Sequence, residues 1–184
     1  MKENQRVALS KRLLKEALVR LLEKKKLDNI TVFELCAEAG INRATFYRHY
    51  GIPKDLLLDL ELDMVEEIRS ALKKPFQQEN VLENIETIFT YLYERSRIVK
   101  IMLLANSDAD LIQLLNAVYS DMWKEYAAAN DAQDLDEETL RLLSVYFGGG
   151  GYFLLRYWLL EDIPKTPQEI VKLIVYVLEL SNKK

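Results

Sequence analysis

The pattern of apolar and polar positions along this chain repeats with helical rather than strand spacing. Between residues 4 and 25 the apolar positions form one stripe, made by Leu14, Ala17, Leu18, Leu21 and Leu22. The same spacing predicts later helices near 54–73, 79–94, 97–106, 108–129, 136–161 and 167–181. Only 6 glycines and 4 prolines interrupt the 184 residues, and such a low content of turn residues favours helices. We therefore predict an all-α protein of about nine helices.

Two shorter elements follow the first helix and have clear boundary residues. Thr31 and Glu34 stand three apart in "TVFE", which is the capping-box pattern at the start of a helix. Gly40 is suited to the left-handed conformation that ends this helix near Ala39. Asn42 is a good N-cap for the next short helix. Two short helices with a Gly-containing turn of about four residues form a helix-turn-helix, whose second helix enters the DNA major groove.

The second of these helices, in "NRATFYRHYG", combines basic and aromatic side chains. Phe46 is predicted to turn inward as its packing anchor. That orientation leaves four residues at the groove-facing end, namely Asn42, Arg43, Ala44 and Thr45. Three further side chains could then donate hydrogen bonds to phosphate oxygens, namely Tyr47, Arg48 and His49. The alternative is a surface helix whose aromatic residues serve only as core.

Charge is unevenly distributed along the chain. Residues 1–50 hold eleven Lys and Arg against six Asp and Glu, whereas residues 51–184 hold fourteen against twenty-three. The net charge of −4 would argue against a nucleic-acid partner. A basic segment on an acidic body, however, concentrates the positive field near the helix-turn-helix.

The segment "ITVFELCAEAGINRATFYRHYGIPKDLLLDL", residues 30–60, strongly resembles the DNA-binding segment of the TetR family of transcriptional regulators. Thr31, the turn Ala39-Gly40-Ile41, the triplet Thr45-Phe46-Tyr47 and the pair His49-Tyr50 all fall in register. The resemblance implies a three-helix DNA-binding domain over residues 1–52. It also implies a helical regulatory and dimerisation domain over residues 53–184.

The function implied is sequence-specific binding of double-stranded DNA. We expect a ligand-responsive repressor that binds a palindromic operator as a homodimer and responds to a small-molecule effector of unknown identity. The alternative is a TetR-like co-regulator that acts mainly through a protein partner. Thr31 is included among the expected DNA-binding residues because it matches the family motif.

Two departures from the family pattern bear on the site. Cys36 occupies a position that is usually alanine, and it is either a small buried hydrophobe or a redox sensor. Ile52 and Pro53 stand where the family often has a polar cap followed by a phosphate-contacting lysine. Proline suits the first turn of a helix but cannot make that contact. Lys54, one residue later, is the candidate to replace it.

The last two long helices are apolar around most of their circumference, so each should bury more than one side. A second subunit would cover the additional side, which predicts a homodimer. The "GGGG" run costs about 1 kcal/mol per glycine within a helix, so it marks either a helix break or a close helix crossing. The predicted interface residues are Gly148, Gly149, Gly150, Gly151, Leu155, Ile174 and Leu178.

The effector pocket is expected among apolar and amphipathic residues of the C-terminal helices. The candidates are Met102, Tyr119, Met122, Trp123, Tyr126 and Tyr152. Residues of these types at helical spacing also serve as ordinary core, and the sequence leaves both interpretations open.

Several function classes are excluded by composition and motifs. One histidine and one cysteine cannot supply a structural zinc site, and no motif pairs a nucleophile with a base. We therefore expect no enzyme activity, no metal and no cofactor. The apolar stretch from Leu142 to Leu160 contains Arg156 and the four glycines and lacks a basic flank. It is predicted to be a buried helix rather than a membrane span, in a cytoplasmic protein without a signal region.

Overall fold

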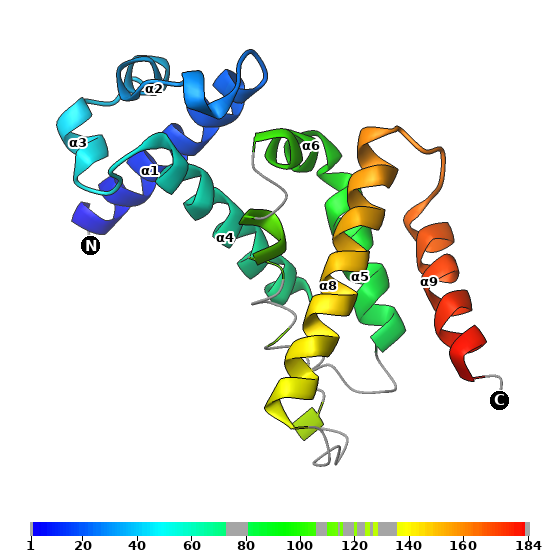
Figure 1. Ribbon diagram of the computed structural model, residues 1–184. Coiled ribbons are helices and arrows are strands. Elements are labelled where there is room, and N and C mark those ends of the chain that lie inside the picture. Colours follow the sequence, from blue (N-terminus) through cyan, green and yellow to red (C-terminus); the bar gives the residue numbers. More distant parts are fainter. Residues whose placement is uncertain are drawn as a thin grey trace. The chain divides into compact units, whose positions relative to one another are not determined.

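The computed structural model describes residues 2–72, 81–105 and 136–182, together with a few positions between 110 and 128. Every regular element within these ranges is a helix, which confirms the predicted fold class. A short 3-10 helix, η1 (Leu27–Asn29), follows the first long helix. The α-helices, labelled in Figure 1, are α1 (Lys2–Leu22), α2 (Val32–Ala39), α3 (Arg43–Tyr47), α4 (Pro53–Ala71), α5 (Val81–Glu94), α6 (Ser96–Ala105), α8 (Glu137–Leu160) and α9 (Pro167–Asn182). Most of the helix predicted at 108–129 lies outside the described residues.

The chain divides into two compact units, and the division falls within α4. The first unit runs to Glu66 and takes in a short piece that begins at Leu104. The second unit contains the remainder, from Glu67 onward. The domain boundary predicted between residues 52 and 53 lies at the start of the same helix and stays a prediction.

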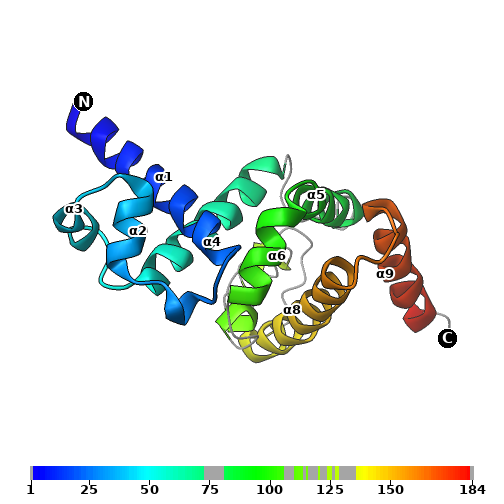
Figure 2. The same ribbon diagram turned by 90° about the horizontal axis from the view of Figure 1, so that it is seen from above.

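The core of the first unit forms where the predicted apolar stripe of α1 meets the shorter helices. Leu14, Ala17 and Leu18 are completely buried, and α1 packs against α2. Figure 2 shows α2 and α3 on one side of α1. Leu35 of α2 and Leu56 of α4 complete this core. Full burial of a leucine side chain contributes about 1.5–3 kcal/mol, so these contacts stabilise α2, which at 8 residues is too short to be stable alone.

The second unit packs α5, α8 and α9 together. Trp158 of α8 is buried, and its ring stacks on Tyr93 of α5 with centroids 5.2 Å apart. Phe89 lies on the same α5 and contacts the Trp158 ring at 6.0 Å. Helix α9 packs against α5 and buries Ile170 and Val171. The axes of α5, α8 and α9 are broadly aligned in Figure 1, with α9 antiparallel to α8, and Figure 2 shows α6 running across them.

Helix α8 continues without a break through all four glycines. It begins at Asp136, whose side chain accepts a hydrogen bond from the backbone N–H of Thr139 at 2.7 Å. It ends at a left-handed residue, Asp162, with φ 49°. Of the two interpretations of the glycine run, the structure therefore excludes the helix break. Among the helices that the structure describes, none is both long and apolar enough to cross a membrane.

Candidate DNA-binding site

The helix-turn-helix is built from the boundary residues that the sequence predicted. The backbone N–H of Glu34 donates to the Thr31 hydroxyl oxygen at 3.2 Å, and the Glu34 carboxylate accepts from the backbone N–H of Thr31 at 3.1 Å. This reciprocal pair is the predicted capping box. Gly40 has φ 65°, and Ile41 donates its N–H to the Cys36 carbonyl at 2.9 Å. These contacts form the Schellman ending that turns the chain from α2 into α3.

The recognition helix, α3, begins at Asn42 as predicted. The Asn42 side-chain oxygen accepts from the backbone N–H of Ala44 at 2.8 Å, which satisfies one of the open donors of the first turn. Phe46 is completely buried and Tyr50 is nearly so, and their ring centroids lie 5.6 Å apart. This aromatic pair is the inward anchor of the helix. The prediction for Phe46 is confirmed.

The outer face of the recognition helix holds most of the residues expected to contact DNA. Five of them are exposed, namely Asn42, Arg43, Ala44, Tyr47 and Arg48, while Thr45 is half-buried. Tyr47 leaves 59% of its surface open to solvent, and its ring meets Phe46 edge-on at 5.6 Å. The exposed guanidinium groups of Arg43 and Arg48 can donate to base edges, and the exposed hydroxyl of Tyr47 can donate to phosphate oxygens.

His49 is placed differently from its neighbours. The residue is half-buried, and its Nε2 atom is buried without a hydrogen-bond partner among the residues that the structure describes. A phosphate contact through this nitrogen would require the imidazole ring to turn outward. The expected phosphate contact of His49 therefore stays a prediction.

Thr31 is exposed at the start of α2, but its hydroxyl is already engaged. It donates to Glu34 Oε2 at 2.8 Å, in addition to accepting the cap hydrogen bond. Lys25 forms an ion pair with the other Glu34 oxygen at 2.6 Å. A phosphate bound by Thr31 would have to share this hydroxyl with the carboxylate, and Lys25 offsets the negative charge that the phosphate would meet.

The start of α4 has no polar N-cap residue, and a carboxylate within its first turn accepts the hydrogen bonds instead. Pro53 opens the helix, as predicted, and Ile52 precedes it with an exposed side chain. The Asp55 carboxylate accepts from the backbone N–H groups of Gly51 and Ile52, at 2.8 and 3.1 Å. Sequence reasoning missed this role, although an acidic residue in the first helical turn is the signal that could have revealed it. Lys54 is exposed between Pro53 and Asp55, and its phosphate contact stays a prediction.

The surroundings of Cys36 distinguish a small buried hydrophobe from a redox sensor. Its side chain is buried within α2. Burial raises the pKa of the thiol, and the nearby charge of Arg43 opposes this only in part. A buried thiol with a raised pKa is a poor nucleophile, so the structure favours a packing role over a redox sensor.

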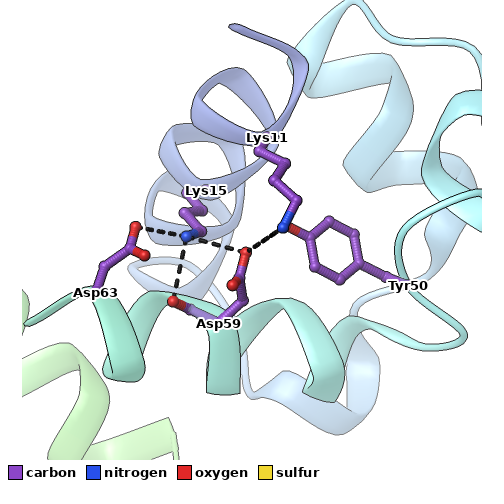
Figure 3. A network of polar contacts seen from close by, with 5 residues as sticks. All are labelled: Lys11, Lys15, Tyr50, Asp59 and Asp63. Carbon is purple, nitrogen blue, oxygen red and sulfur yellow. Dashed lines mark hydrogen bonds and ion pairs between the residues drawn. The ribbon is translucent and has the colours of Figure 1, made fainter. Parts of the chain in front are cut away.

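One group of polar residues escaped the sequence interpretation. Figure 3 shows Lys11 and Lys15 of α1 converging with Tyr50 on the carboxylate of Asp59, which belongs to α4. The Tyr50 hydroxyl donates to Asp59 Oδ2 at 2.5 Å, and Lys15 Nζ lies 3.0 Å from the same oxygen. Lys15 also pairs with Asp63 at 2.5 Å. The two lysines lie outside the apolar stripe of α1. No local pattern links them to Asp59 and Asp63, which lie 44 to 48 positions further along the chain.

This group perturbs the ionisation of its members. Burial tends to raise the pKa of Asp59, but hydrogen bonds from Tyr50 and Lys15 and the charges of Lys15 and Lys11 outweigh it, so the pKa is lowered. Burial, followed by the hydrogen bond to Asp59, raises the pKa of Tyr50 well above its ordinary value. The network therefore consists of an ionised carboxylate and a neutral phenol over the ordinary pH range.

The residues predicted for the effector pocket are only partly described. Met102 of α6 and Tyr152 of α8 are buried in the second unit. Burial agrees with a pocket and with ordinary core alike. The other four candidates, Tyr119, Met122, Trp123 and Tyr126, lie outside the described residues.

The predicted interface residues fall on two sides of α8 and on α9. Gly148 and Leu155 are buried within their own chain, whereas Gly149 and Gly151 are half-buried and Gly150 is exposed. Ile174 of α9 is half-buried, and the side chain of Leu178 lies outside the described residues. A stripe of exposed apolar residues extends along α8 beside Gly149 and Gly150, comprising Leu142, Val145, Tyr146, Phe153 and Tyr157. We call these five residues the α8 stripe.

The geometry defines an all-helical protein with an N-terminal helix-turn-helix, and comparison with known sequences identifies the family. Residues 79–180 match a TetR family model described as the C-terminal region of a transcriptional regulator. The chain therefore belongs to the TetR family of transcriptional regulators. This family consists of regulators rather than enzymes. No curated protein matches the sequence.

Solved structures agree with the fold. A protein described as a TetR-family transcriptional regulator from Syntrophomonas wolfei is 15% identical, with a TM-score of 0.72 over 91% of this chain and 92% of the other. A TetR transcriptional regulator from Streptococcus agalactiae is 18% identical, with a TM-score of 0.69 over 96% and 97%. The TetR family repressor AlkX from Dietzia, implicated in biodegradation of n-alkanes, is 18% identical, with a TM-score of 0.55 over 92% and 95%. At these identities the likeness concerns the fold.

Proposed function

We propose that this chain is a repressor that binds a palindromic operator as a homodimer and leaves it when a small molecule binds the second unit. The observation that carries the proposal is the recognition helix itself. Asn42 caps it, Phe46 and Tyr50 anchor it, and Arg43 is exposed at its N-terminal end. An arginine in that position can donate two hydrogen bonds to a guanine edge in the major groove.

The α8 stripe supports the homodimer. Five large apolar side chains along one helix face form a patch of a kind that monomeric proteins seldom expose. On α9, Leu173 and Tyr176 are exposed as well. A second copy of the same face would bury both helices, giving a four-helix interface with two-fold symmetry. Two helix-turn-helix units related by that symmetry would then read a palindrome with half-sites about 34–36 Å apart.

Repression and effector release are tested separately from DNA binding. The repressor AlkX has a similar fold, and buried Met102 and Tyr152 are compatible with a pocket in the second unit. A reporter gene placed behind the selected operator would show lower expression when the protein is present. Higher expression would contradict repression but leave DNA binding intact.

The DNA-binding proposal is tested by selecting duplexes from a random library with the full-length protein. We expect an inverted repeat to be enriched, and the selected duplex to bind at least a hundredfold more tightly than a scrambled one. Sedimentation of the complex should give two chains per duplex. If no sequence is enriched, the chain is not a sequence-specific DNA-binding protein. The co-regulator that acts through a protein partner would then be the better interpretation.

A further inference from the structure

The recognition helix needs tertiary contacts to hold its position, because it is short. Helix α3 contains only five residues, Arg43–Tyr47, and an isolated helix of that length is not stable in water. The buried ring of Phe46 supplies apolar contact, but apolar burial is not directional. A hydrogen bond to a charged group is both directional and strong.

The directional contact in this chain runs from Tyr50 to Asp59. The backbone N–H of Tyr50 donates to the Phe46 carbonyl at 2.9 Å, so Tyr50 continues the last turn of the recognition helix. Its buried hydroxyl donates to Asp59 Oδ2 at 2.5 Å (Figure 3). The end of the recognition helix is thereby joined to α4 through a single carboxylate.

The two lysines of α1 hold that carboxylate in place. Lys15 Nζ lies 3.0 Å from Asp59 Oδ2, and it also donates to the backbone carbonyl of Asp59 at 3.1 Å. Only 12% of the Lys15 side chain is exposed. Lys11 Nζ is 3.4 Å from the same oxygen and 5.4 Å from the centre of the Tyr50 ring. With Asp63 included, two positive and two negative charges balance within the group.

We infer that Asp59 is a positioning residue for DNA recognition, acting through the Tyr50 hydroxyl, and that Lys11 and Lys15 serve Asp59 rather than DNA phosphates. The inference rests on the proposed DNA-binding function. Base readout requires side chains to be held within about 0.5 Å and 10–20° of the productive geometry. Loss of the hydrogen bond should therefore reduce the preference for the operator. Contacts that depend only on charge should persist.

Asp59→Leu separates positioning from simple electrostatics, because it removes the acceptor of the Tyr50 hydroxyl with a side chain of similar size, whereas an asparagine amide could still accept. Removing a negative charge near DNA should by itself leave the affinity ratio unchanged, because binding would tighten equally on every sequence. Positioning predicts instead that Asp59→Leu lowers the ratio of affinities for selected and scrambled duplexes. Tyr50→Phe should lower this ratio by roughly tenfold, and the double variant should lose little more than Tyr50→Phe alone, because both changes affect one hydrogen bond.

Tyr91→Phe is the matched control in the second unit. The buried Tyr91 hydroxyl donates to Glu67 of α4 at 2.5 Å, the distance found between Tyr50 and Asp59. The same chemical change there should leave the affinity ratio within about twofold of the wild type. Lys15→Met tests whether Lys15 contacts a DNA phosphate. If it does, the substitution should reduce the salt dependence of binding by about one unit of slope.

The experiment uses full-length variants, the duplex selected by the wild type and a scrambled duplex, in fluorescence anisotropy at several salt concentrations. Urea unfolding confirms that each variant is folded. Positioning is supported if Tyr50→Phe and Asp59→Leu lower the ratio while Tyr91→Phe leaves it unchanged and Lys15→Met leaves the salt slope unchanged. It is overturned if Asp59→Leu leaves or raises the ratio, or if Tyr91→Phe lowers it equally. If the wild type selects no duplex, the proposed function itself fails, which is a distinct result.

Discussion

Thr31 and Glu34 exchange hydrogen bonds across the first turn of α2, and Lys25 completes the arrangement with a 2.6 Å ion pair to Glu34. The hydrogen bond from Lys25, followed by those from Thr31, lowers the pKa of Glu34 to about 2. Its ordinary value is 4.5. Ionised Glu34 therefore stabilises the folded protein at any pH above its unfolded pKa, and this contribution disappears as pH falls through the folded pKa.

Glu34→Gln tests this linkage. The amide can still accept from the Thr31 N–H but is neutral at every pH, so the variant should unfold at lower urea concentration than wild type above about pH 4.5. The difference between the two midpoints should shrink as pH falls from about 4.5 towards 2. Lys25→Gln removes the largest cause of the lowered pKa of Glu34. Stability should then begin to fall at a higher pH as the solution is acidified. A difference that does not vary with pH would show that the ionised carboxylate contributes nothing.

Asp162 gives a second prediction, on backbone conformation. It adopts φ 49° in the position where helices usually end with glycine, and the N–H of Ile163 donates to the Trp158 carbonyl at 3.1 Å. Its carboxylate also pairs with Lys100 of α6. The left-handed conformation costs roughly 1–2 kcal/mol for a residue with a Cβ and less for Asp, whereas an exposed ion pair contributes about 0–1 kcal/mol.

Replacing Asp162 by glycine or by alanine should therefore change the free energy of unfolding in different directions. Asp162→Gly loses the ion pair but removes the conformational cost, and we expect stability between unchanged and about 1 kcal/mol higher. Asp162→Ala keeps the cost and loses the pair, and we expect a loss of about 1 kcal/mol. Lys100→Met measures the ion pair alone. Urea denaturation of the three variants checks the order, and an alanine variant as stable as the glycine variant would contradict it.

The elements that could be predicted from sequence are those fixed by neighbours three or four residues away. The capping box at Thr31, the left-handed Gly40 and the N-cap at Asn42 depend only on local side chains, and all three are present. Helix α8 was predicted over 136–161 and spans Glu137–Leu160. Its N-cap Asp136 acts on Thr139, again three residues away.

The features that could not be predicted depend on residues far apart in the chain or on unusual residue choices. Tyr50, Lys15 and Asp59 meet only because α1 and α4 pack in the first unit, and Lys15 had no distinguishing local pattern. Asp162 ends α8 although aspartate is uncommon in the left-handed conformation. The circumference of α8 was recognised as apolar, but only the structure shows that Gly148 and Leu155 face inward while Gly149 and Gly150 lie beside exposed aromatic residues.

Arg43 and Tyr47 should have different effects on DNA binding. Both are exposed on the recognition helix, but a guanidinium can read a base edge, whereas a tyrosine hydroxyl at this position would bind phosphate. Arg43→Ala should change the sequence preference, at a cost of about 1–3 kcal/mol on the preferred base pair. Tyr47→Phe should weaken binding evenly across sequences. Repeating the duplex selection with each variant checks both expectations, and equal losses on all sequences for Arg43→Ala would exclude base reading.

Gly149 and Gly150 allow the proposed dimer to be tested without disturbing the protomer. Within the part of the chain that the structure describes, and apart from α8's own backbone, a Cβ added at either position would meet nothing within 4 Å. Alanine at each site should therefore stabilise an isolated helix by about 1 kcal/mol relative to glycine. In the proposed dimer a larger side chain at these positions would meet the second copy, and overpacking of a close contact typically costs about 1–3 kcal/mol.

We therefore expect Gly149→Leu and Gly150→Leu to keep the helical content of the wild type but to sediment as monomers or aggregates. Both variants should lose operator binding, because a single helix-turn-helix contacts only one half-site. The double alanine variant is the matched control, since it raises helix propensity while adding only two methyl groups. If the wild type is monomeric at micromolar concentration, or the leucine variants remain dimeric, this face of α8 is not the interface. The α8 stripe would then need an explanation other than this two-fold contact, since its side chains remain exposed within the part of the protomer that the structure describes.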